Sequence, residues 1–273
     1  MVSRLRALVV CALSVVAFAA VSLVPANAQS VADEVIQRGS IRVATVTGSP
    51  PFAFVDKNGN LEGFDIDIAH LIAKSLFDDE NKVEFVRTSF DGRWETISSG
   101  RADFGIMGTT IYPARLKLAN FTEGYVDSGN GCLVKKASPI KGFGDLDRAN
   151  VTIAFLNVAQ DHKRKDTLYP KAKALYFEHQ ADQYAAVLSG QAQVACTDYP
   201  VLAYAVKEHP DQLRMLPGMT QGVYNNAIFM KKGDFQWWYT LNTLVDEMRH
   251  GSLYTDYDKI YMKWFGKHAP PER

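Results

Sequence analysis

From position 41 onward, short apolar runs typical of strands alternate with longer stretches whose apolar residues recur every three or four positions. Residues 41–46 predict a strand. Residues 63–76 predict an amphipathic helix, because Ile68, Ile72 and Leu76 lie four positions apart. The alternation of these two patterns predicts an α/β fold, in which helices pack against a sheet.

Two acidic residues, Asp65 and Asp67, stand at the start of this helix. Either carboxylate can cap the first turn, and both suit the positive end of a helix. A structural role at the helix start therefore explains the pair more simply than acid–base catalysis.

Residues 97–106 and 187–196 follow the same pattern, ninety positions apart. In each, the end of a helix is followed by a glycine, Gly100 or Gly190, and then by a buried strand. A single repeat is too little for a solenoid. We expect two similar α/β lobes, with a chance recurrence of a common arrangement as the alternative.

The chain ends with two helical patterns, residues 235–250 and 252–265, separated by Gly251. Each carries apolar residues that predict packing against the core rather than a functional role. These residues are Leu241, Leu244, Val245 and Met248 in the first pattern, and Ile260, Met262, Trp264 and Phe265 in the second.

Residues 1–28 have the pattern of a secretory signal peptide: a short cationic start, an apolar run of 18 residues (7–24), and small residues at Ala26 and Ala28. The run also approaches the length of a membrane span, so an anchor is the alternative. Valines precede Cys11, which argues against a lipoprotein. We expect cleavage after Ala28 and a soluble protein of 245 residues in the periplasm.

The 273 residues include 30 Lys and Arg against 30 Asp and Glu, a net charge of zero. Removal of Arg4 and Arg6 with the signal peptide leaves 28 basic against 30 acidic residues. Neither balance suits nucleic acid or an anionic membrane surface as a partner.

Three cysteines are too few for a fold that disulfides hold together. Cys132 and Cys196 can pair in an oxidising compartment, yet both lie in apolar strand-like runs, where buried thiols are common. We expect both thiols to be free and buried.

The motifs of common catalytic and cofactor sites are missing: the sequence has no phosphate-binding loop, dinucleotide-binding turn or nucleophile elbow. The six histidines are scattered, with none at metal-ligand spacing from another histidine or a cysteine. The sequence therefore predicts no catalytic residue, no metal and no cofactor.

Two segments suit a small charged ligand. Residues 108–115 follow a predicted strand and offer hydroxyls, backbone N–H groups, and the planar guanidinium of Arg115, which can meet both oxygens of a carboxylate. The alternative is a solvated surface arginine. Asp198 ends the repeated strand of the other half and precedes Pro200, so it can bind a cation or cap a helix. Together, the two segments suit a zwitterion held between the lobes.

The segment 63–68 (Gly-Phe-Asp-Ile-Asp-Ile), continued by Leu71, Ile72 and Leu76, resembles a motif of the periplasmic solute-binding proteins of the polar amino-acid family. These proteins are the extracytoplasmic receptors of ABC importers. The resemblance runs from about residue 41 to residue 266. Its further matches are Pro51-Phe52, Phe90, Gly108-Thr109-Thr110 with Arg115, residues 121–125, Thr197-Asp198 and residues 261–266.

The resemblance implies a fold of two α/β lobes, each with a central sheet flanked by helices, joined by two hinge strands and closing around the ligand. The first lobe would comprise residues 29–128 and 224–273, and the second lobe residues 129–223. The implied partners are an amino acid or similar small zwitterion and the membrane subunits of an ABC importer. We expect the protein to act as a monomer.

The resemblance also implies roles for single residues. Arg115 and Thr110 match the residues that hold the α-carboxylate of the ligand, together with backbone N–H groups near Gly108. Asp198, in the matched pair Thr197-Asp198, corresponds to the acid that takes the α-ammonium group. The aromatic residues match as well: Phe90 corresponds to one that covers the ligand, and Phe52 lies in the adjacent wall.

The chain departs from the family pattern at three places. Val46 replaces an acid, which argues against a cationic ligand side chain, and Ser49 replaces an aromatic residue. Val158-Ala159-Gln160 replaces a Gly-Thr-Thr turn that adds carboxylate contacts, for which Gln160 or backbone N–H groups can substitute. We expect four residues to set specificity. They are Ser49, Asn157, Gln160 and Asp161.

Two other classes of protein use a similar fold. An exported enzyme resembling the dehydratases of prephenate or arogenate is the alternative function, favoured by the altered turn at residues 158–160. No clear general acid stands at a matched position, which argues against it. A sensor domain would need a membrane span that the sequence does not indicate beyond residues 7–24.

Overall fold

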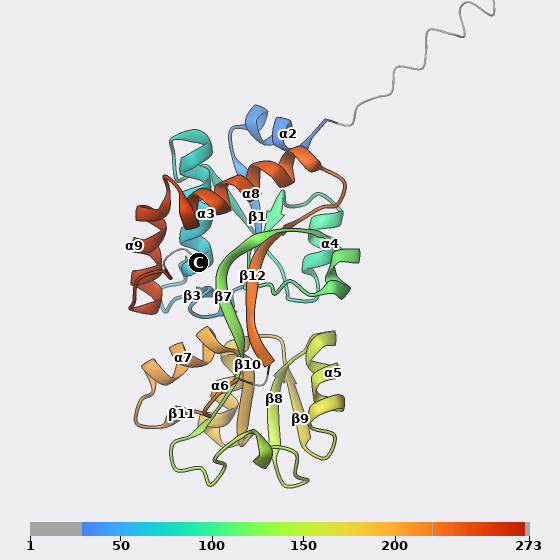
Figure 1. The fold of residues 1–273 in the computed structure, drawn as a ribbon, viewed down its shortest axis with the longest axis vertical. Helices are drawn as coiled ribbons and strands as arrows, with labels where there is room; N and C mark the ends of the chain where they lie inside the picture. Colours follow the sequence, from blue (N-terminus) through green and yellow to red (C-terminus); the bar gives the residue numbers. More distant parts are fainter. Residues whose placement is uncertain (1–28, 220, 271–273) are drawn as a thin grey trace, which may run out of the picture. The chain divides into compact units, whose positions relative to one another are not determined.

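The computed structural model describes residues 29–219 and 221–270 (Figure 1). The predicted signal peptide, residues 1–28, lies outside the described residues. Residues 31–273 form one compact unit. In the described part of the chain, no helix has the length and apolar character needed to cross a membrane.

The helices and strands alternate as the sequence predicts. The helices are α2 (Val31–Arg38), α3 (Phe64–Phe77), α4 (Arg93–Ser98), α5 (Ala159–Leu168), α6 (Gln180–Ser189), α7 (Tyr199–Glu208), α8 (Phe235–His250) and α9 (Tyr254–Phe265), with short 3-10 turns η1 (Pro113–Lys117) and η2 (Phe143–Asp145). The strands are β1 (Ile41–Thr45), β2 (Gly48–Ser49), β3 (Ala53–Val55), β4 (Leu61–Glu62), β5 (Val83–Arg87), β6 (Phe104–Gly105), β7 (Asn120–Lys135), β8 (Thr152–Leu156), β9 (Lys173–Phe177), β10 (Val194–Asp198), β11 (Leu213–Met215) and β12 (Gln221–Met230).

The main sheet has the order β5-β1-β6-β12-β7-β10-β8-β9, and its two halves repeat the same plan. In one half β1 pairs in parallel with β5 and β6, and β12 runs antiparallel to β6. In the other half β8 pairs in parallel with β9 and β10, and β7 runs antiparallel to β10. The repeated segments of the sequence therefore correspond, since β6 and β10 take equivalent places. Gly100 (φ +75°) and Gly190 (φ +84°) close the preceding helices in the left-handed conformation that favours glycine.

Strands β7 and β12 connect the two halves (Figure 1). They pair antiparallel from Asn120 opposite Met230 at one end to Asn130 opposite Gln221 at the other. We call β1, β5 and β6 with α2, α3, α4, α8 and α9 the first lobe, and β8–β11 with α5–α7 the second lobe. The expected divisions after residues 128 and 223 fall within β7 and β12, and stay predictions.

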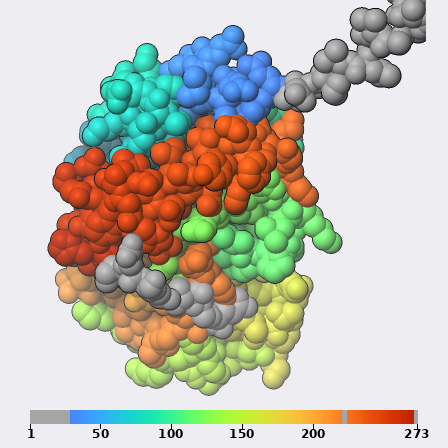
Figure 2. Space-filling model, turned by 45° about the horizontal axis from the view of Figure 1, so that its top comes forward, coloured from blue at the N-terminus to red at the C-terminus, as the bar shows by residue number. Residues whose placement is uncertain are grey.

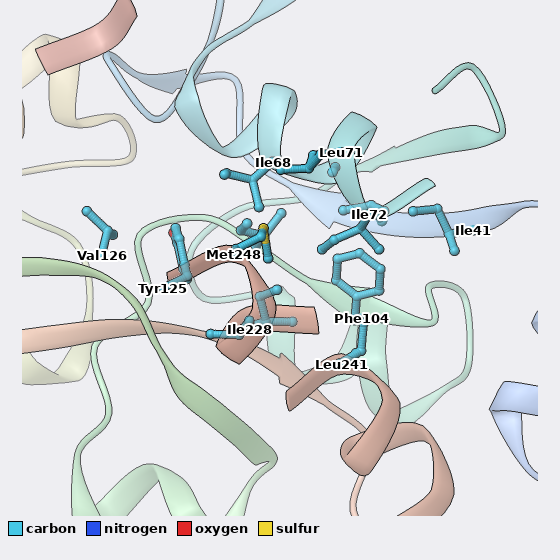
Figure 3. Close-up of a cluster of buried hydrophobic side chains, with 14 of the residues drawn as sticks. Ile41, Ile68, Leu71, Ile72, Phe104, Tyr125, Val126, Ile228, Leu241 and Met248 are labelled. Atoms are coloured by element: carbon cyan, nitrogen blue, oxygen red, sulfur yellow. The ribbon is translucent and has the colours of Figure 1, made fainter. Parts of the chain in front are cut away.

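The core of the first lobe forms where α3 and α8 pack on β1, β6 and β12 (Figure 3). Ile68 and Ile72 of α3 are buried as their four-residue spacing predicts, and they share this cluster with Phe104 of β6 and Leu241 and Met248 of α8. Figure 2 shows α8 and α9 side by side on the surface, next to α2 and α3.

The C-terminal helices confirm one prediction and correct another. Helix α8 has the predicted bounds, and the carboxylate of Asp234 caps it by accepting from the N–H of Trp237 at 2.9 Å. Helix α9 begins at Tyr254 rather than residue 252. Its buried side chains are Tyr257 and Tyr261, which had not been expected, whereas Ile260, Trp264 and Phe265 of the expected set are partly buried against the same core.

The expectation that Asp65 or Asp67 caps α3 is wrong. Gly63 takes the N-cap position, and no side chain caps the helix. Asp67 Oδ2 instead accepts from the indole N–H of Trp264 at 2.7 Å and from Lys263, which ties α3 to α9. Asp65 is completely buried and accepts from the hydroxyl of Tyr125 at 2.7 Å.

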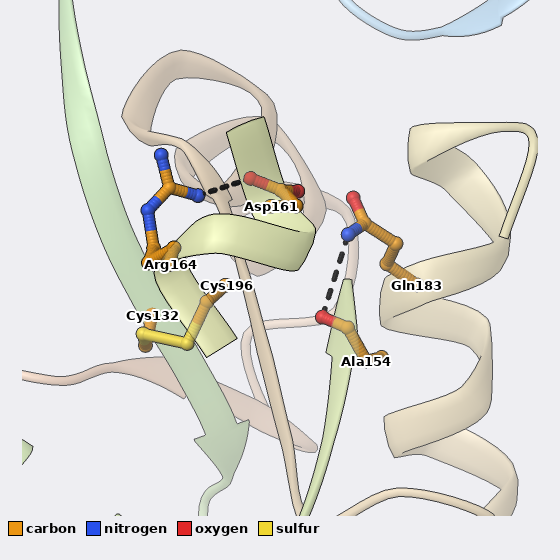
Figure 4. Close-up of a disulfide and its surroundings, with 6 residues drawn as sticks. All are labelled: Cys132, Ala154, Asp161, Arg164, Gln183 and Cys196. Carbon is orange, nitrogen blue, oxygen red and sulfur yellow. Dashed lines mark hydrogen bonds and ion pairs between the residues drawn. A yellow bond between two sulfur atoms is a disulfide. The ribbon is translucent and has the colours of Figure 1, made fainter. Parts of the chain in front are cut away.

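The expectation of free thiols is also wrong, because Cys132 and Cys196 form a disulfide (Figure 4). The two residues stand directly opposite each other in the antiparallel pair β7–β10. Both are buried, as predicted, within the hydrophobic core of the second lobe. The sequence could not decide the pairing, since it depends on the register between two strands 64 residues apart.

Candidate functional site

A polar cavity of about 40 Å³ lies among elements of both lobes. From the first lobe it is lined by α4, the loop after β6, and η1, and from the second lobe by α5, α6 and the end of β10. The lining residues are Phe90, Arg93, Gly108, Thr110, Tyr112, Arg115, Asn130, Leu156, Val158, Gln160, Asp161, Arg164, Gln180, Thr197 and Asp198. Eight of the eleven residues expected at the ligand site are among them.

A second, larger cavity of about 300 Å³ lies among β7, α7 and α9. Its lining is mostly apolar and includes Tyr204, Trp264 and Phe265. It contains none of the residues predicted to bind a ligand. The smaller polar cavity is therefore the candidate functional site.

The loop after β6 is held in place from behind by Asp65. Gly108 has a φ of +56°, in the left-handed region, and its N–H donates to Asp65 Oδ2 at 3.0 Å. Burial raises the pKa of Asp65 to about 7, although its hydrogen bonds from Tyr125 and Gly108 oppose the rise. The N–H of Gly108, expected to hold a ligand carboxylate, is thus committed to an internal hydrogen bond.

Arg115 stands on η1 with its guanidinium at the cavity. One terminal nitrogen donates to the carbonyl of Thr110 at 2.7 Å, and the Tyr112 ring lies 4.9 Å below the guanidinium carbon. Burial lowers the pKa of Arg115, but the guanidinium stays charged at any physiological pH. It retains donors for a carboxylate, because a guanidinium has five N–H groups.

A chain of hydrogen bonds links Thr110 in the first lobe to Asp198 in the second. Thr110 Oγ1 donates to Asn226 Oδ1 at 2.9 Å, and Asn226 Nδ2 donates to Asp198 Oδ2 at 3.3 Å. Asn226 lies on the hinge strand β12 and is completely buried. No local pattern in the sequence indicates this residue, which fixes two cavity-lining groups, those of Thr110 and Asp198, relative to each other.

Asp198 takes the N-cap position of α7, but its side chain makes no cap hydrogen bond. Burial raises the pKa of Asp198 to about 6. The helix-cap alternative therefore fails to account for the carboxylate, which is directed to Asn226 and the cavity.

Residues 158–160, which stand where the family has a Gly-Thr-Thr turn, form the start of α5. The helix begins at Ala159, so its positive end lies beside the cavity, which Val158 and Gln160 line. Asp161, expected to set specificity, forms a buried ion pair with Arg164 (Figure 4) and accepts from the N–H of Leu156 at 3.0 Å. Burial raises the pKa of Asp161, and Arg164 opposes this.

Three of the expected ligand residues do not line the cavity. Phe52 is completely buried in the first-lobe core, where it packs against Phe64 and Phe265. Asn157 is exposed, and its amide donates to Glu178 at 2.8 Å. Ser49 is buried and donates to the side chain of Gln180, a lining residue.

Several lining residues had not been predicted, most notably two arginines. Arg93 begins α4, and Arg164 lies on α5. The sequence contains a signal for neither, because a charged residue on a short helix is usually solvated and its direction depends on how the helix packs. Gln180 begins α6, and the direction of its side chain likewise depends on how that helix packs. It joins Ser49 to the hydroxyl of Thr197, to which it donates at 2.7 Å.

Among residues 29–219 and 221–270, no group of three or more His, Cys, Asp or Glu side chains is placed to hold a metal ion. The cavity instead carries separated groups of opposite charge. Arg115 faces it from the first lobe and Asp198 from the second. This arrangement suits a small molecule with one anionic and one cationic group.

The family model of bacterial extracellular solute-binding proteins, family 3, matches residues 41–267. The chain belongs to this family. The glutamine-binding protein of an ABC transporter of Bacillus subtilis is 31% identical over 215 residues, which are 79% of this chain and 76% of that protein.

Solved structures of amino-acid-binding proteins have the same fold. An ancestral amino acid-binding protein, described as a precursor of cyclohexadienyl dehydratase, superposes with a TM-score of 0.77 and 36% identity, over 85% of this chain and 98% of that one. A cysteine-binding protein of Campylobacter jejuni gives a TM-score of 0.79 at 27% identity, over 90% and 96% of the two chains. The two-lobed α/β fold of periplasmic binding proteins, expected from the sequence, is therefore confirmed.

Proposed function

We propose that this protein binds an amino acid or a related small zwitterion in the polar cavity as its two lobes close, and delivers it to the membrane subunits of an ABC importer. The observation that carries the proposal is the presence of Arg115 and Asp198 in one cavity, each from a different lobe. The relatives of this protein that are named above are binding proteins for amino acids. We further propose that it acts as a monomer in the periplasm, after removal of residues 1–28.

In the proposed complex, Arg115 binds the α-carboxylate and Asp198 the α-ammonium group. Hydrogen bonds to charged groups contribute about 1.5–3 kcal/mol each, and micromolar affinity needs about 8 kcal/mol. Two charged contacts reach that value only when water is excluded. Closure of the lobes excludes water, and Phe90, which is buried at the cavity, adds an aromatic surface to the ligand.

Catalysis by this cavity would require an acid or base free to exchange a proton with the ligand. Of the two lining carboxylates, Asp161 pairs with Arg164, and Asp198 is the group proposed above to bind the α-ammonium group. These contacts favour a receptor over the alternative of a dehydratase-like enzyme.

The proposal predicts that an amino acid raises the melting temperature of the purified protein, and that Arg115→Ala or Asp198→Ala largely abolishes the rise. A screen of the common amino acids, opines and small carboxylates by differential scanning fluorimetry measures this. Arg148→Ala and Asp145→Ala are matched controls, because these residues form an ion pair outside the cavity. Absence of stabilisation by every compound, or normal binding by both cavity variants, would refute the proposal.

A further inference from the structure

One charged side chain of the cavity has neither a hydrogen-bond partner nor an ion-pair partner among the described residues. Arg93 is only 3% exposed and lines the cavity. Its Nε has no hydrogen-bond partner, and no hydrogen bond or ion pair joins its guanidinium to any residue of the described chain. Its neighbours are aromatic faces, with Trp94 and Phe90 at 4.5 and 5.6 Å from the guanidinium carbon to the ring centroids.

The other charges of the cavity are matched. Arg164 pairs with Asp161. A bound zwitterion supplies a carboxylate to Arg115 and an ammonium group to Asp198. Arg93 then remains a buried cation without an anion, and an uncompensated buried charge is strongly unfavourable. A ligand with one further negative charge removes the imbalance.

The position of Arg93 allows one small molecule to reach both Arg93 and Arg115, the two lining arginines without an ion-pair partner among the described residues. The guanidinium carbons of Arg93 and Arg115 lie 4.5 and 5.8 Å from the centroid of the same ring, that of Trp94. Burial, and next the repulsion from Arg115, lower the pKa of Arg93, and the attraction of Asp91 and Asp198 opposes this only in part. Burial and this repulsion diminish the stability of its charged form until an anion binds beside it.

The residues around the cavity are consistent with a ligand whose side chain is anionic. Val46, which follows β1, is buried in the apolar cluster that contains the lining residues Phe90 and Val158. The carboxylates that line the cavity, Asp161 and Asp198, already have the partners described above. A cationic ligand side chain would therefore meet Arg93 without a free acid to pair with.

We propose that the ligand is an amino acid with a second carboxylate in its side chain, and that Arg93 binds this carboxylate. The proposal rests on the function proposed above and narrows its ligand class. The planar fork of an arginine meets both oxygens of a carboxylate, whereas a side-chain amide offers one oxygen and no charge. Arg93 is thus the residue that distinguishes an acid from its amide.

Isothermal titration calorimetry with two matched pairs, glutamate against glutamine and aspartate against asparagine, tests the proposal on purified protein freed of carried-over ligand by unfolding and refolding. We expect one acid to bind about tenfold or more tightly than its amide. Arg93→Gln should remove this preference, mainly by weakening the acid. Arg93→Lys keeps the charge without the fork, and should keep part of the preference. Arg101→Gln is the matched control, since it removes an exposed arginine outside the cavity, and should leave the preference unchanged.

Amides that bind as tightly as the acids, or a preference that survives Arg93→Gln, would overturn the proposal. The comparison of acids with amides on the unaltered protein decides the question even if Arg93→Gln fails to fold. Binding of neutral or cationic amino acids without a preference for acids refutes only this inference. If no amino acid of any class binds, the proposed function itself fails.

Discussion

Among single residues, Asp198 is an acid whose hydrogen-bond partner and pKa are both set by the surrounding fold. Its carboxylate is placed by Asn226, a buried side chain of the hinge strand β12, rather than by an arginine. A cation from outside, such as an ammonium group, can therefore supply the partner that the protein lacks at this position. Burial meanwhile raises the pKa of Asp198 to about 6, close to the pH range in which bacteria grow.

This pKa predicts a pH dependence of binding. Below pH 6 the carboxyl of Asp198 is protonated in the free protein, whereas an ammonium group binds only the ionised form. Affinity for the amino acid that best stabilises the protein should be constant above about pH 7 and fall by up to about tenfold per unit below pH 6. Calorimetric titrations between pH 5 and 8 measure this.

Asp198→Asn provides the control for that series, since its weakened binding should not vary over the same pH range. No histidine lines the cavity, so none contributes directly to the expected slope. A slope that persists in Asp198→Asn would assign it to another buried acid, either Asp161 of the lining or Asp65 behind Gly108. A flat profile for the unaltered protein would contradict the expected role of Asp198.

Sequence reasoning located those site residues that end strands or occupy a distinctive loop. Arg115, Thr110 and Asp198 were predicted because a sheet gathers its strand ends at one edge. Arg93 and Arg164 were not, because they lie on short helices whose direction follows from packing. For Phe52 the family resemblance implied a place in the wall of the ligand site, but its ring packs in the core of the first lobe.

At the level of elements, β7 belongs to the hinge at one end and to the sheet of the second lobe at the other. It pairs with β12 along the hinge and with β10 in the second lobe. The disulfide of Cys132 and Cys196 fastens the second pair covalently. Thr197, the next residue of β10, lines the cavity, so this bond stabilises the strand that positions the ligand-facing groups.

Removal of the disulfide should lower the free energy of unfolding. A crosslink between residues 64 positions apart reduces the entropy of the unfolded chain, a contribution of about 4 kcal/mol in the loop-closure model and commonly about 2–4 kcal/mol in practice. We expect a loss in this range for Cys132→Ala combined with Cys196→Ala. Urea denaturation of the double variant under oxidising conditions measures it.

Reduction of the unaltered protein provides the companion experiment. It should lower stability by a similar amount and leave the double variant unaffected. Equal stability of the oxidised protein and the double variant would show that the bond contributes nothing to folding.

Elements with local signals could be predicted from the residues themselves, whereas the two hinge strands were implied only by the family resemblance. Helix α8 has a capping Asp234 before it and Gly251 after it, so its bounds follow from short-range chemistry. Strands β7 and β12 depend on each other over a long sequence separation, and their register shifts at irregular positions. Such pairing comes from tertiary contacts, which no local pattern encodes.

At the level of the whole molecule, the two lobes touch beside the cavity through β2 and α6. Ser49 donates to Gln180, and Gly48 lies against the ring of His179. A Cβ atom at position 48 would lie only 2.5 Å from His179 Cγ. The absence of a side chain at Gly48 therefore allows the lobes to approach this closely.

Gly48→Val should hinder closure without disturbing either lobe. We expect its affinity for the stabilising amino acid to fall by about tenfold or more, because ligand selects the closed arrangement, while the melting temperature without ligand stays the same. Calorimetry and differential scanning fluorimetry measure the two quantities. Gly144→Val is the matched control, since a Cβ atom there meets no heavy atom within 4 Å. Unchanged affinity in Gly48→Val would show that this contact does not limit closure.

The two lobes differ in how the chain supplies their cores. The clusters of the second lobe draw only on residues 132–216, one continuous stretch. The first-lobe core combines Val35 near one end of the described chain with Leu241, Val245 and Met248 near the other. As the chain emerges from its N-terminal end, the second lobe can thus complete its core early, whereas α3 and β1 stay uncovered until β12, α8 and α9 emerge. The last fifth of the chain therefore sets the time at which a binding-competent receptor first exists.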